Sequence, residues 1–231
     1  LIKGWILAKL AVVVRRSIVK KYNLEKNFKQ TQSDEKIRWA DLRWYADLAA
    51  NVYSSKDKIH AIYDKDFSVY INEINEIQYI VLTDKTTKNN YVSIRGTSNS
   101  HNAMQDINFF KDKSKRLGIN IHTGFHRTAE MIADDLLSRL KEDYKVCVTG
   151  HSLGGAAAVV VSWYLDYANF NVGECITFGQ PKVTDSHGNR TMRDKIKLTR
   201  VVNETDVVPL VPPTGTHRHR YAHTGTLIKL L

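Results

Sequence analysis

The segment Gly150–Gly155, GHSLGG, constrains the fold of this chain more than any other. It follows the short apolar run Tyr144–Thr149, YKVCVT, and precedes the alanine-rich apolar stretch Ala156–Tyr167. The first run has the length and composition of a buried strand, and the second has those of a buried helix. At such a junction the G-x-S-x-G pattern fits a sharp strand-to-helix turn, in which flanking glycines avoid backbone clashes and the serine hydroxyl is exposed. The sequence therefore predicts that Ser152 is a nucleophile at the start of a helix.

Strands and helices alternate along the rest of the chain. Residues 35–52 have helical periodicity without Gly or Pro, and residues 124–141 place large apolar side chains on one side of a helix. Short runs rich in β-branched and aromatic residues have the composition of strands, namely 77–83, 91–95, 174–178, 197–202 and part of 221–230. The first two of these runs flank a polar turn and are expected to pair. The pattern predicts an α/β fold, with a mostly parallel central sheet and helices on both faces.

The composition excludes several classes of protein. With 231 residues and 42% hydrophobic side chains, the chain can bury a substantial core and is too apolar to be disordered. Two cysteines do not make a disulfide-rich scaffold. Cys147 and Cys175 fall on strands expected to be adjacent, which is a poor geometry for a disulfide, so buried free thiols are expected. No apolar stretch reaches transmembrane length.

Most of the positive charge lies near the amino-terminal end. Residues 1–30 carry +7 of the formal +10, and apolar residues recur among the bases at helical spacing. We expect residues 1–34 to be a basic amphipathic extension and residues 35–231 to be the main domain. The extension would either pack on that domain or lie on an anionic membrane surface. A nucleic-acid partner is not favoured, because the bases are confined to one segment without a binding motif. The compartment is left open, with secretion or membrane association favoured.

A nucleophilic serine needs a base, and the base needs a carboxylate that orients it. On an α/β-hydrolase scaffold the order along the chain is serine, acid, histidine. The candidate acids are Asp185, Glu204 and Asp206, and Asp206 follows an apolar strand where the rim of the sheet is expected. The candidate bases are His217, His219 and His223, and spacing does not choose among them. A metal site on these histidines is not favoured, because no nearby cysteine or carboxylate completes a ligand set.

Seven segments in order resemble the class 3 lipase family, the fungal-type triacylglycerol lipases. The resemblance covers roughly residues 38–231. Its segments are SIRGT at 93–97, Asp106 with Phe109, TGF at 123–125, VTGHSLGGA at 148–156, FGQPKV at 178–183, VNETDVVP at 202–209 and YAHTG at 221–225. The resemblance implies an α/β-hydrolase fold and ester hydrolysis through an acyl-enzyme on Ser152, with no metal or organic cofactor. It assigns Asp206 as the acid of the triad and His223 as the base.

The oxyanion that forms in acyl transfer needs hydrogen-bond donors. One is expected from the N–H of Leu153, the residue after the nucleophile. The resemblance places the second at Thr97, and it places a lid near residues 98–109. Family lids often carry a tryptophan where this chain has Ala103, and polar residues dominate here. A polar lid gains little at an oil surface, which predicts weak interfacial activation and activity on soluble esters of short or medium chain length.

Three other functions remain open. The basic residues His217, Arg218 and Arg220 would suit a phosphate head group, which favours phospholipase A1 activity. A feruloyl-type esterase shares the scaffold and the polar lid. The alternative outside the enzymes is a non-catalytic lipid- or membrane-binding module, although the intact triad residues argue against it.

Overall fold

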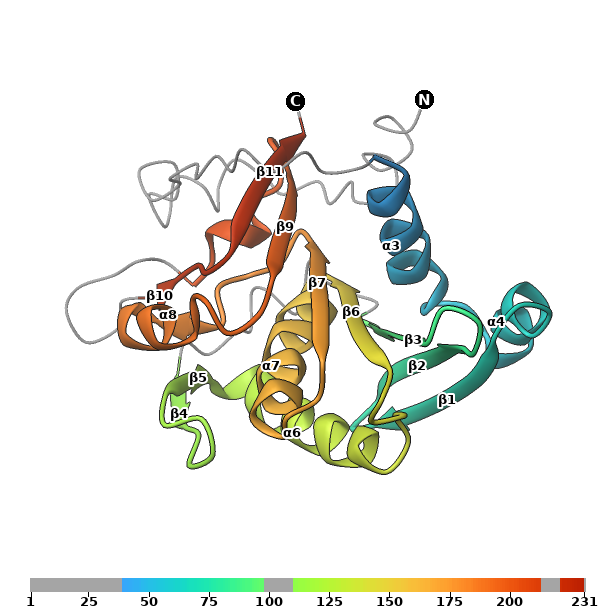
Figure 1. The fold of residues 1–231 in the computed structure, drawn as a ribbon. Helices are drawn as coiled ribbons and strands as arrows, with labels where there is room; N and C mark the ends of the chain where they lie inside the picture. Colours follow the sequence, from blue (N-terminus) through green and yellow to red (C-terminus); the bar gives the residue numbers. More distant parts are fainter. Residues whose placement is uncertain (1–38, 98–109, 213–220, 231) are drawn as a thin grey trace.

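A computed structural model of the chain describes residues 39–97, 110–212 and 221–230 (Figure 1). The expected extension at 1–34 and the expected lid at 98–109 lie outside these residues, as do His217 and His219.

The centre of the fold is a seven-stranded sheet with the strand order β1-β2-β3-β6-β7-β9-β11. Its first three strands pair antiparallel: β1 (Ser68–Ile74), β2 (Ile77–Asp84) and β3 (Asn89–Ile94). From β3 onward every pair is parallel, through β6 (Lys145–His151), β7 (Val172–Phe178), β9 (Leu198–Asn203) and β11 (Thr226–Leu230). The expected pairing of the runs at 77–83 and 91–95 is confirmed as the hairpin β2–β3.

Helices cover both faces of this sheet (Figure 1). One face carries α6 (Thr123–Leu137) and α7 (Leu153–Tyr167), and the other carries α3 (Trp39–Asn51). Along β6, Val146 and Val148 pack in the core formed with α6 and α7, whereas Cys147 packs in the core formed with α3. Because successive side chains of a strand point to opposite faces, a strand buried on both faces must be apolar throughout. The predicted α/β-hydrolase architecture is confirmed.

The predicted state of the cysteines is also confirmed. Cys147 and Cys175 are free and buried. They lie on the adjacent parallel strands β6 and β7, but Cys147 pairs with Glu174 in the register, and Cys175 pairs with Val148. Burial raises the pKa of both thiols, which keeps them protonated and unreactive.

Several smaller elements give no clear signal in the sequence. A second sheet, with the order β10-β8-β5-β4, consists of β4 (Lys111–Lys113), β5 (Asn120–His122), β8 (Thr184–Asp185) and β10 (Tyr221–Ala222). Strands of two or three residues are too short to show an alternating pattern. The remaining elements are α4 (Lys56–Tyr63), α8 (Ser186–Met192) and the 3-10 helix η2 (Val208–Leu210).

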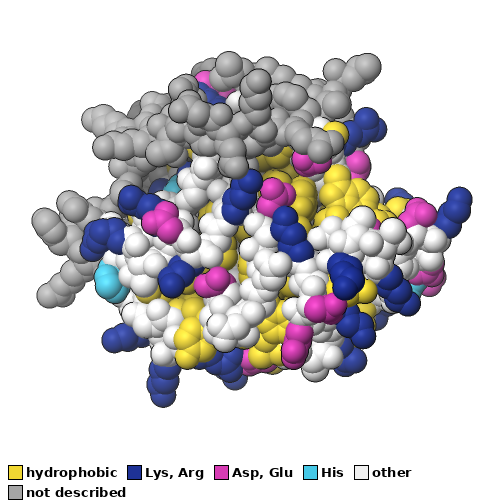
Figure 2. Space-filling model, in the orientation of Figure 1, with side chains coloured by type: hydrophobic (Ala, Val, Ile, Leu, Met, Phe, Trp, Pro, Cys, Tyr) yellow, Lys and Arg dark blue, Asp and Glu magenta, His cyan; other side chains and the backbone are white. Residues whose placement is uncertain are grey.

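The charges on the described surface are mixed. On the face shown in Figure 2, lysine and arginine side chains alternate with acidic ones and leave apolar atoms exposed between them. Within the part of the chain that the structure describes, no helix combines the length and the apolar character needed to cross a membrane.

The first turn of α7 lies directly against the end of β3. A Cβ atom added to Gly154 would collide with the carbonyl oxygen of Ile94 and would lie 2.7 Å from backbone atoms of Arg95 and Gly96. At Gly155, an added Cβ would meet its nearest atom, the carbonyl oxygen of Gly150, at 3.1 Å. A side chain is therefore excluded at Gly154 by immobile backbone, whereas at Gly155 small shifts would admit one.

We predict that Gly154→Ala destabilises the protein by about 2–3 kcal/mol or more, because β3 and α7 must separate to admit the methyl group. The matched variant Gly155→Ala should stay within about 1 kcal/mol of the parent, since alanine favours the helix and its contacts are only slightly tight. Urea denaturation of the three proteins measures both differences. Equal stability of the two variants would show that α7 and β3 are not packed as described.

Candidate active site

Ser152 lies at the junction between β6 and α7. Its φ of 55° and ψ of −124° are a strained combination for a residue with a side chain. Its N–H donates to the carbonyl oxygen of Phe178 at 2.9 Å. Its own carbonyl oxygen accepts from Gly155 and Ala156, at 3.0 and 3.2 Å, in the first turn of α7. These bonds hold the strained turn at the end of a helix where unpaired N–H groups favour negative charge.

The turn leaves no room for a side chain at Gly150. An added Cβ would collide with the carbonyl group of Gly154 and would lie 2.8 Å from the nitrogen of Gly155. The two outer glycines of G-x-S-x-G are thus required for different reasons. Gly150 is enclosed by the helix that turns back over it, and Gly154 is enclosed by the end of β3.

The two segments expected to supply the oxyanion hole touch each other beside Ser152. At Gly96, which precedes Thr97, an added Cβ would lie 2.7 Å from the carbonyl oxygen of His151 and 3.2 Å from the nitrogen of Gly154. Leu153 is the first residue of α7, where an N–H has no intrahelical acceptor. Thr97 Oγ1 is buried and has no partner within the described residues. The structure brings the predicted donors close to the nucleophile, and their roles stay predictions.

Tyr53 also lies at this site, although nothing in the sequence marks it, and it contacts His151 of the G-x-S-x-G segment. The hydroxyl of Tyr53 accepts the N–H of Gly96 at 3.0 Å and lies 3.3 Å from His151 Nδ1. Tyr53 is in the turn after α3, far from Gly96 and His151 in sequence. No local motif marks it, because only the folded sheet brings α3 to the end of β3.

Asp206 follows β9 at the same edge of the sheet, since β6, β7 and β9 are adjacent and parallel. The residue is 5% exposed. Its Oδ1 accepts the N–H of Val208 at 2.9 Å, whereas its Oδ2 is buried without a partner among the described residues. Burial raises the pKa of Asp206 to about 7, although the bond from Val208 lowers it. The structure therefore supplies a buried acid with one oxygen available to orient a base.

The other two candidate acids have structural roles. Asp185 caps α8 by accepting from His187 and Gly188, at 3.1 and 2.9 Å, and it forms an ion pair with Lys111 at 3.4 Å. Glu204 is exposed and pairs with Lys229. Neither carboxylate is available to a base beside Ser152, which leaves Asp206 as the candidate acid.

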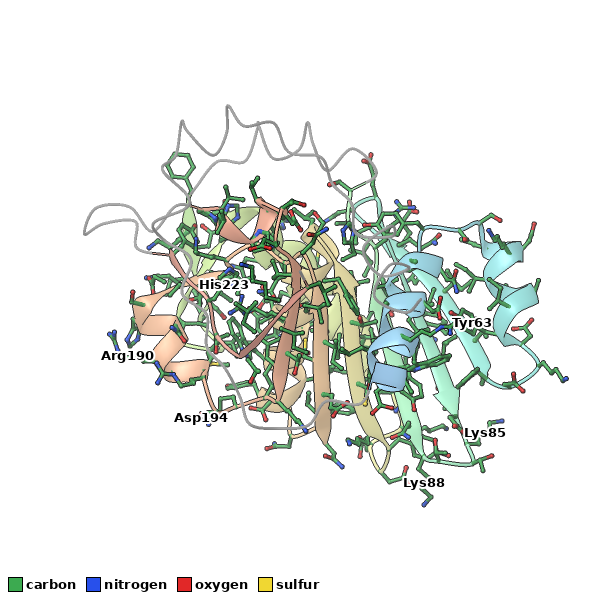
Figure 3. The ribbon with its side chains drawn as sticks, turned by 90° about the horizontal axis from the view of Figure 1, so that it is seen from above. Tyr63, Lys85, Lys88, Arg190, Asp194 and His223 are labelled. Atoms are coloured by element: carbon green, nitrogen blue, oxygen red, sulfur yellow. The ribbon has the colours of Figure 1, made fainter. Side chains whose placement is uncertain are left out.

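His223 is not brought into hydrogen-bond contact with Ser152 or Asp206. Its Nε2 bonds to the carbonyl oxygen of Pro209 at 2.6 Å, and its Nδ1 is buried without a partner among the described residues. Because a carbonyl only accepts, Nε2 carries the proton, which is the opposite tautomer from the one a serine triad uses. His223, labelled in Figure 3, precedes β11. The first residue of β11 pairs with Thr199 near the start of β9, whereas Asp206 follows the end of β9.

Two buried cations surround the imidazole of His223. Lys182 Nζ donates to the carbonyl oxygens of Leu210 and Pro212, at 2.5 and 2.9 Å. Arg200 Nε donates to the carbonyl oxygen of Thr224 at 2.9 Å, and its Nη1 is buried without a partner in the described residues. Burial, followed by the charges of Arg200 and Lys182, holds the pKa of His223 well below its usual range. Burial also lowers the pKa of Lys182, to about 7.

The sheet, its two helical layers and the strained serine define a protein with the α/β-hydrolase fold. Residues 91–216 match the family described as Lipase (class 3). The chain belongs to this family.

The relatives and solved structures that the chain matches include several fungal lipases. It is 28% identical over 197 residues to a lipase of Rhizomucor miehei, which covers 76% of this chain and 54% of that protein. It is 31% identical over 162 residues to the secreted mono- and diacylglycerol lipase 1 of Fusarium solani, covering 65% of this chain and 48% of that protein. The chain thus spans about half the length of the curated relatives it matches.

Two solved structures share the fold over most of the chain. The propeptide complex of Rhizomucor miehei lipase superposes with a TM-score of 0.70 at 27% identity, covering 82% of this chain and 67% of that one. A triacylglycerol lipase whose catalytic centre is described as a serine protease triad also has a TM-score of 0.70, at 25% identity, covering 87% of this chain and 82% of that one.

The raised pKa of Asp206 leads to a prediction about how the stability of the protein depends on pH. Between its ordinary value of 3.8 and about 7, the folded protein binds this proton more tightly than the unfolded chain does. As the pH rises through that window, ionisation of Asp206 progressively lowers the free energy of unfolding. Above the window the whole of this destabilisation is present. We expect Asp206→Asn to raise the free energy of unfolding by about 2–4 kcal/mol near pH 8 and to change it little near pH 3.5.

Urea denaturation at the two pH values measures this difference. Asp185→Asn is the matched control, because Asp185 is ion-paired and caps a helix, so its loss should destabilise the protein at high pH. An Asp206→Asn variant less stable than the parent near pH 8 would contradict the prediction.

Proposed function

We propose that this protein is a serine ester hydrolase that cleaves acylglycerols or other fatty-acyl esters through an acyl-enzyme on Ser152. The observation that carries the proposal is the strained Ser152 at the start of α7, flanked by Gly154, which meets the end of β3, and by His151, whose carbonyl lies against Gly96. A backbone strained at a serine between a strand and a helix is the geometry of a nucleophile. The sequence predicted a hydroxyl open to solvent, but Ser152 is 3% exposed here. The names of the fungal relatives support the substrate class.

In the proposed mechanism, Ser152 Oγ attacks the ester carbonyl while a histidine takes its proton. The N–H groups of Leu153 and Thr97 stabilise the oxyanion, and each such donor is typically worth about 10²–10³ in rate. Asp206 Oδ2 accepts from the histidine, fixes its tautomer and stabilises the imidazolium. The alcohol leaves, and water releases the acid from Ser152. This route uses only the side chains and backbone of the protein.

His223 stays the predicted base. To act, its imidazole would have to leave the carbonyl of Pro209 and present Nδ1–H to Asp206. His217 and His219 are the other candidates that the sequence leaves open.

The cellular setting is proposed from the relatives and from the charge. The Fusarium solani relative is named as a secreted protein, and we propose secretion for this chain as well. The basic segment 1–30 would bring the protein to anionic lipid surfaces.

The first test is hydrolysis of p-nitrophenyl esters of about two to sixteen carbons by the wild type and by Ser152→Ala. Removal of a triad serine should lower turnover by about 10⁶. His223→Ala, measured beside it, tests the base: a loss of similar size supports His223, and wild-type turnover assigns the proton to another histidine. An inactive wild type, or equal activity of Ser152→Ala, would point instead to the non-catalytic lipid-binding alternative.

The polar residues at 98–109 generate a second prediction. We expect turnover of a short-chain ester to change less than about twofold as its concentration passes the solubility limit, because a polar segment has little apolar area to transfer to oil. Ala103→Trp is the comparison variant, and it should increase the rise in turnover at the solubility limit. A several-fold jump in the wild type would overturn this expectation.

A substrate panel separates the remaining alternatives. Faster hydrolysis of anionic phospholipids than of neutral acylglycerols, lost in Arg218→Gln and Arg220→Gln, would favour phospholipase A1 activity. Preference for feruloyl esters over fatty-acyl esters would favour the feruloyl-type esterase.

A further inference from the structure

Tyr53 makes two polar contacts at once. Its hydroxyl oxygen accepts the N–H of Gly96 at 3.0 Å, and the same oxygen lies 3.3 Å from Nδ1 of His151. Gly96 is the residue before Thr97, and His151 is the residue before Ser152. One hydroxyl therefore joins the two backbone segments that the proposed reaction must hold in register.

The chemistry of the groups fixes the direction of the first bond, and the tautomer of His151 sets the direction of the second. The N–H of Gly96 can only donate, so the tyrosine oxygen accepts from it. Burial lowers the pKa of His151 to about 4, so its imidazole is neutral at neutral pH. With the proton on Nε2, which faces Asp206 Oδ2 beside Gly179, Nδ1 accepts from the tyrosine O–H. His151 is therefore an uncharged acceptor at neutral pH.

The position of Tyr53 is fixed by neighbours outside the catalytic residues. The side-chain amide of Gln78, which is 5% exposed, donates to the carbonyl oxygens of Val52 and Ser54 at 2.7 and 3.1 Å. The backbone carbonyl of Gln78 accepts the N–H of Arg95 at 2.9 Å. The turn that carries Tyr53 and the segment after β3 that carries Gly96 are thus attached to the same residue of β2.

The Tyr53 hydroxyl and the His151 carbonyl both lie close against the backbone of Gly96. A Cβ added to Gly96 would lie 2.6 Å from the hydroxyl oxygen of Tyr53 and 2.7 Å from the carbonyl oxygen of His151. The absence of a side chain at Gly96 therefore allows the tyrosine hydroxyl and the end of β6 to meet the Gly96 peptide directly.

His151 also faces the candidate acid. A Cβ added to Gly179 would lie 2.6 Å from Asp206 Oδ2 and 3.8 Å from His151 Nε2. Both of these atoms are buried, and neither has a hydrogen-bond partner within the described residues. The Nε2 donor of His151 and the Oδ2 acceptor of Asp206 thus approach the same point beside Gly179.

We propose that Tyr53 and His151 are positioning residues that hold the Gly96–Thr97 segment of the oxyanion hole at a fixed distance from Ser152. Tyr53 acts on the donor segment, and His151 couples it to the end of the strand that carries the nucleophile. Neither residue exchanges a proton with the substrate. This inference rests on the proposed ester hydrolysis at Ser152.

The test is Tyr53→Phe, which removes one oxygen and leaves the ring packing intact. We expect kcat on a soluble p-nitrophenyl ester to fall about 10- to 100-fold with KM within about twofold, because only the oxyanion geometry is disturbed. The affinity for a trifluoromethyl ketone, whose adduct with Ser152 carries an oxyanion, should fall by the same factor as kcat. Tyr70→Phe is the matched control, since its hydroxyl bonds Asp135 at 3.1 Å on the far strand β1.

Substitutions of His151 test the coupling. His151→Asn keeps an acceptor where Nδ1 lies and should retain most of the turnover, whereas His151→Leu should lose about as much as Tyr53→Phe. Adding His151→Leu to Tyr53→Phe should lower kcat little further, because both changes break the same connection.

The outcomes separate this inference from the proposed function. Wild-type kcat and ketone affinity in Tyr53→Phe, with Ser152→Ala inactive, would overturn the positioning role alone. Equal losses in Tyr53→Phe and Tyr70→Phe, matched by equal losses of thermal stability, would also overturn it, because they indicate a general effect on folding. Absence of any serine-dependent activity in the wild type would overturn the proposed function first.

Discussion

The contact between the first turn of α7 and the end of β3, made possible by Gly154, is the constraint on which the rest of the site depends. Backbone meets backbone there, because no side chain fits between Gly154 and the carbonyl of Ile94. The close approach places the start of a helix, with its unpaired N–H groups, beside the strand end that continues to Thr97. The strain at Ser152 follows from the same arrangement, since the chain must reverse sharply from β6 into a helix that already touches β3.

The site is built at the expense of stability. Buried polar atoms without partners in the described residues gather around it, among them Thr97 Oγ1, Asp206 Oδ2 and the Nε2 of His151. Each unsatisfied buried group costs of the order of 1–3 kcal/mol. The large apolar layers offset this cost: α7 is buried from Gly154 to Leu165 between the sheet and α6. A rigid core on both sides of the sheet thus holds polar groups that would be better solvated elsewhere.

The sequence predicted those features that depend on local pattern. The strand before Ser152, the helix after it and the glycines between them follow from apolar periodicity and from the space available in a sharp turn, and the family that these segments indicated is confirmed. Tyr53 could not be predicted, because its role depends on α3 reaching the end of β3 through the folded sheet. The short strands β4, β5, β8 and β10 were missed because two or three residues carry no periodicity. The direction of the His223 side chain could not be predicted either, because the motif YAHTG identifies the residue but does not determine its rotamer.

The surroundings of His223 bear on where the proposed catalytic base would act. A general base in acyl transfer becomes an imidazolium, so its protonated form has to be stabilised as Ser152 attacks. Beside Pro209, burial and then the charges of Arg200 and Lys182 hold the pKa of His223 well below the usual range. An imidazole kept there would resist the proton that the reaction delivers. Asp206 offers the opposite environment: a buried carboxylate whose Oδ2 has no partner within the described residues and whose charge would stabilise an imidazolium. We therefore propose that the base acts beside Asp206, and that a histidine held at Pro209 contributes only after its imidazole has moved from the two cations to that carboxylate.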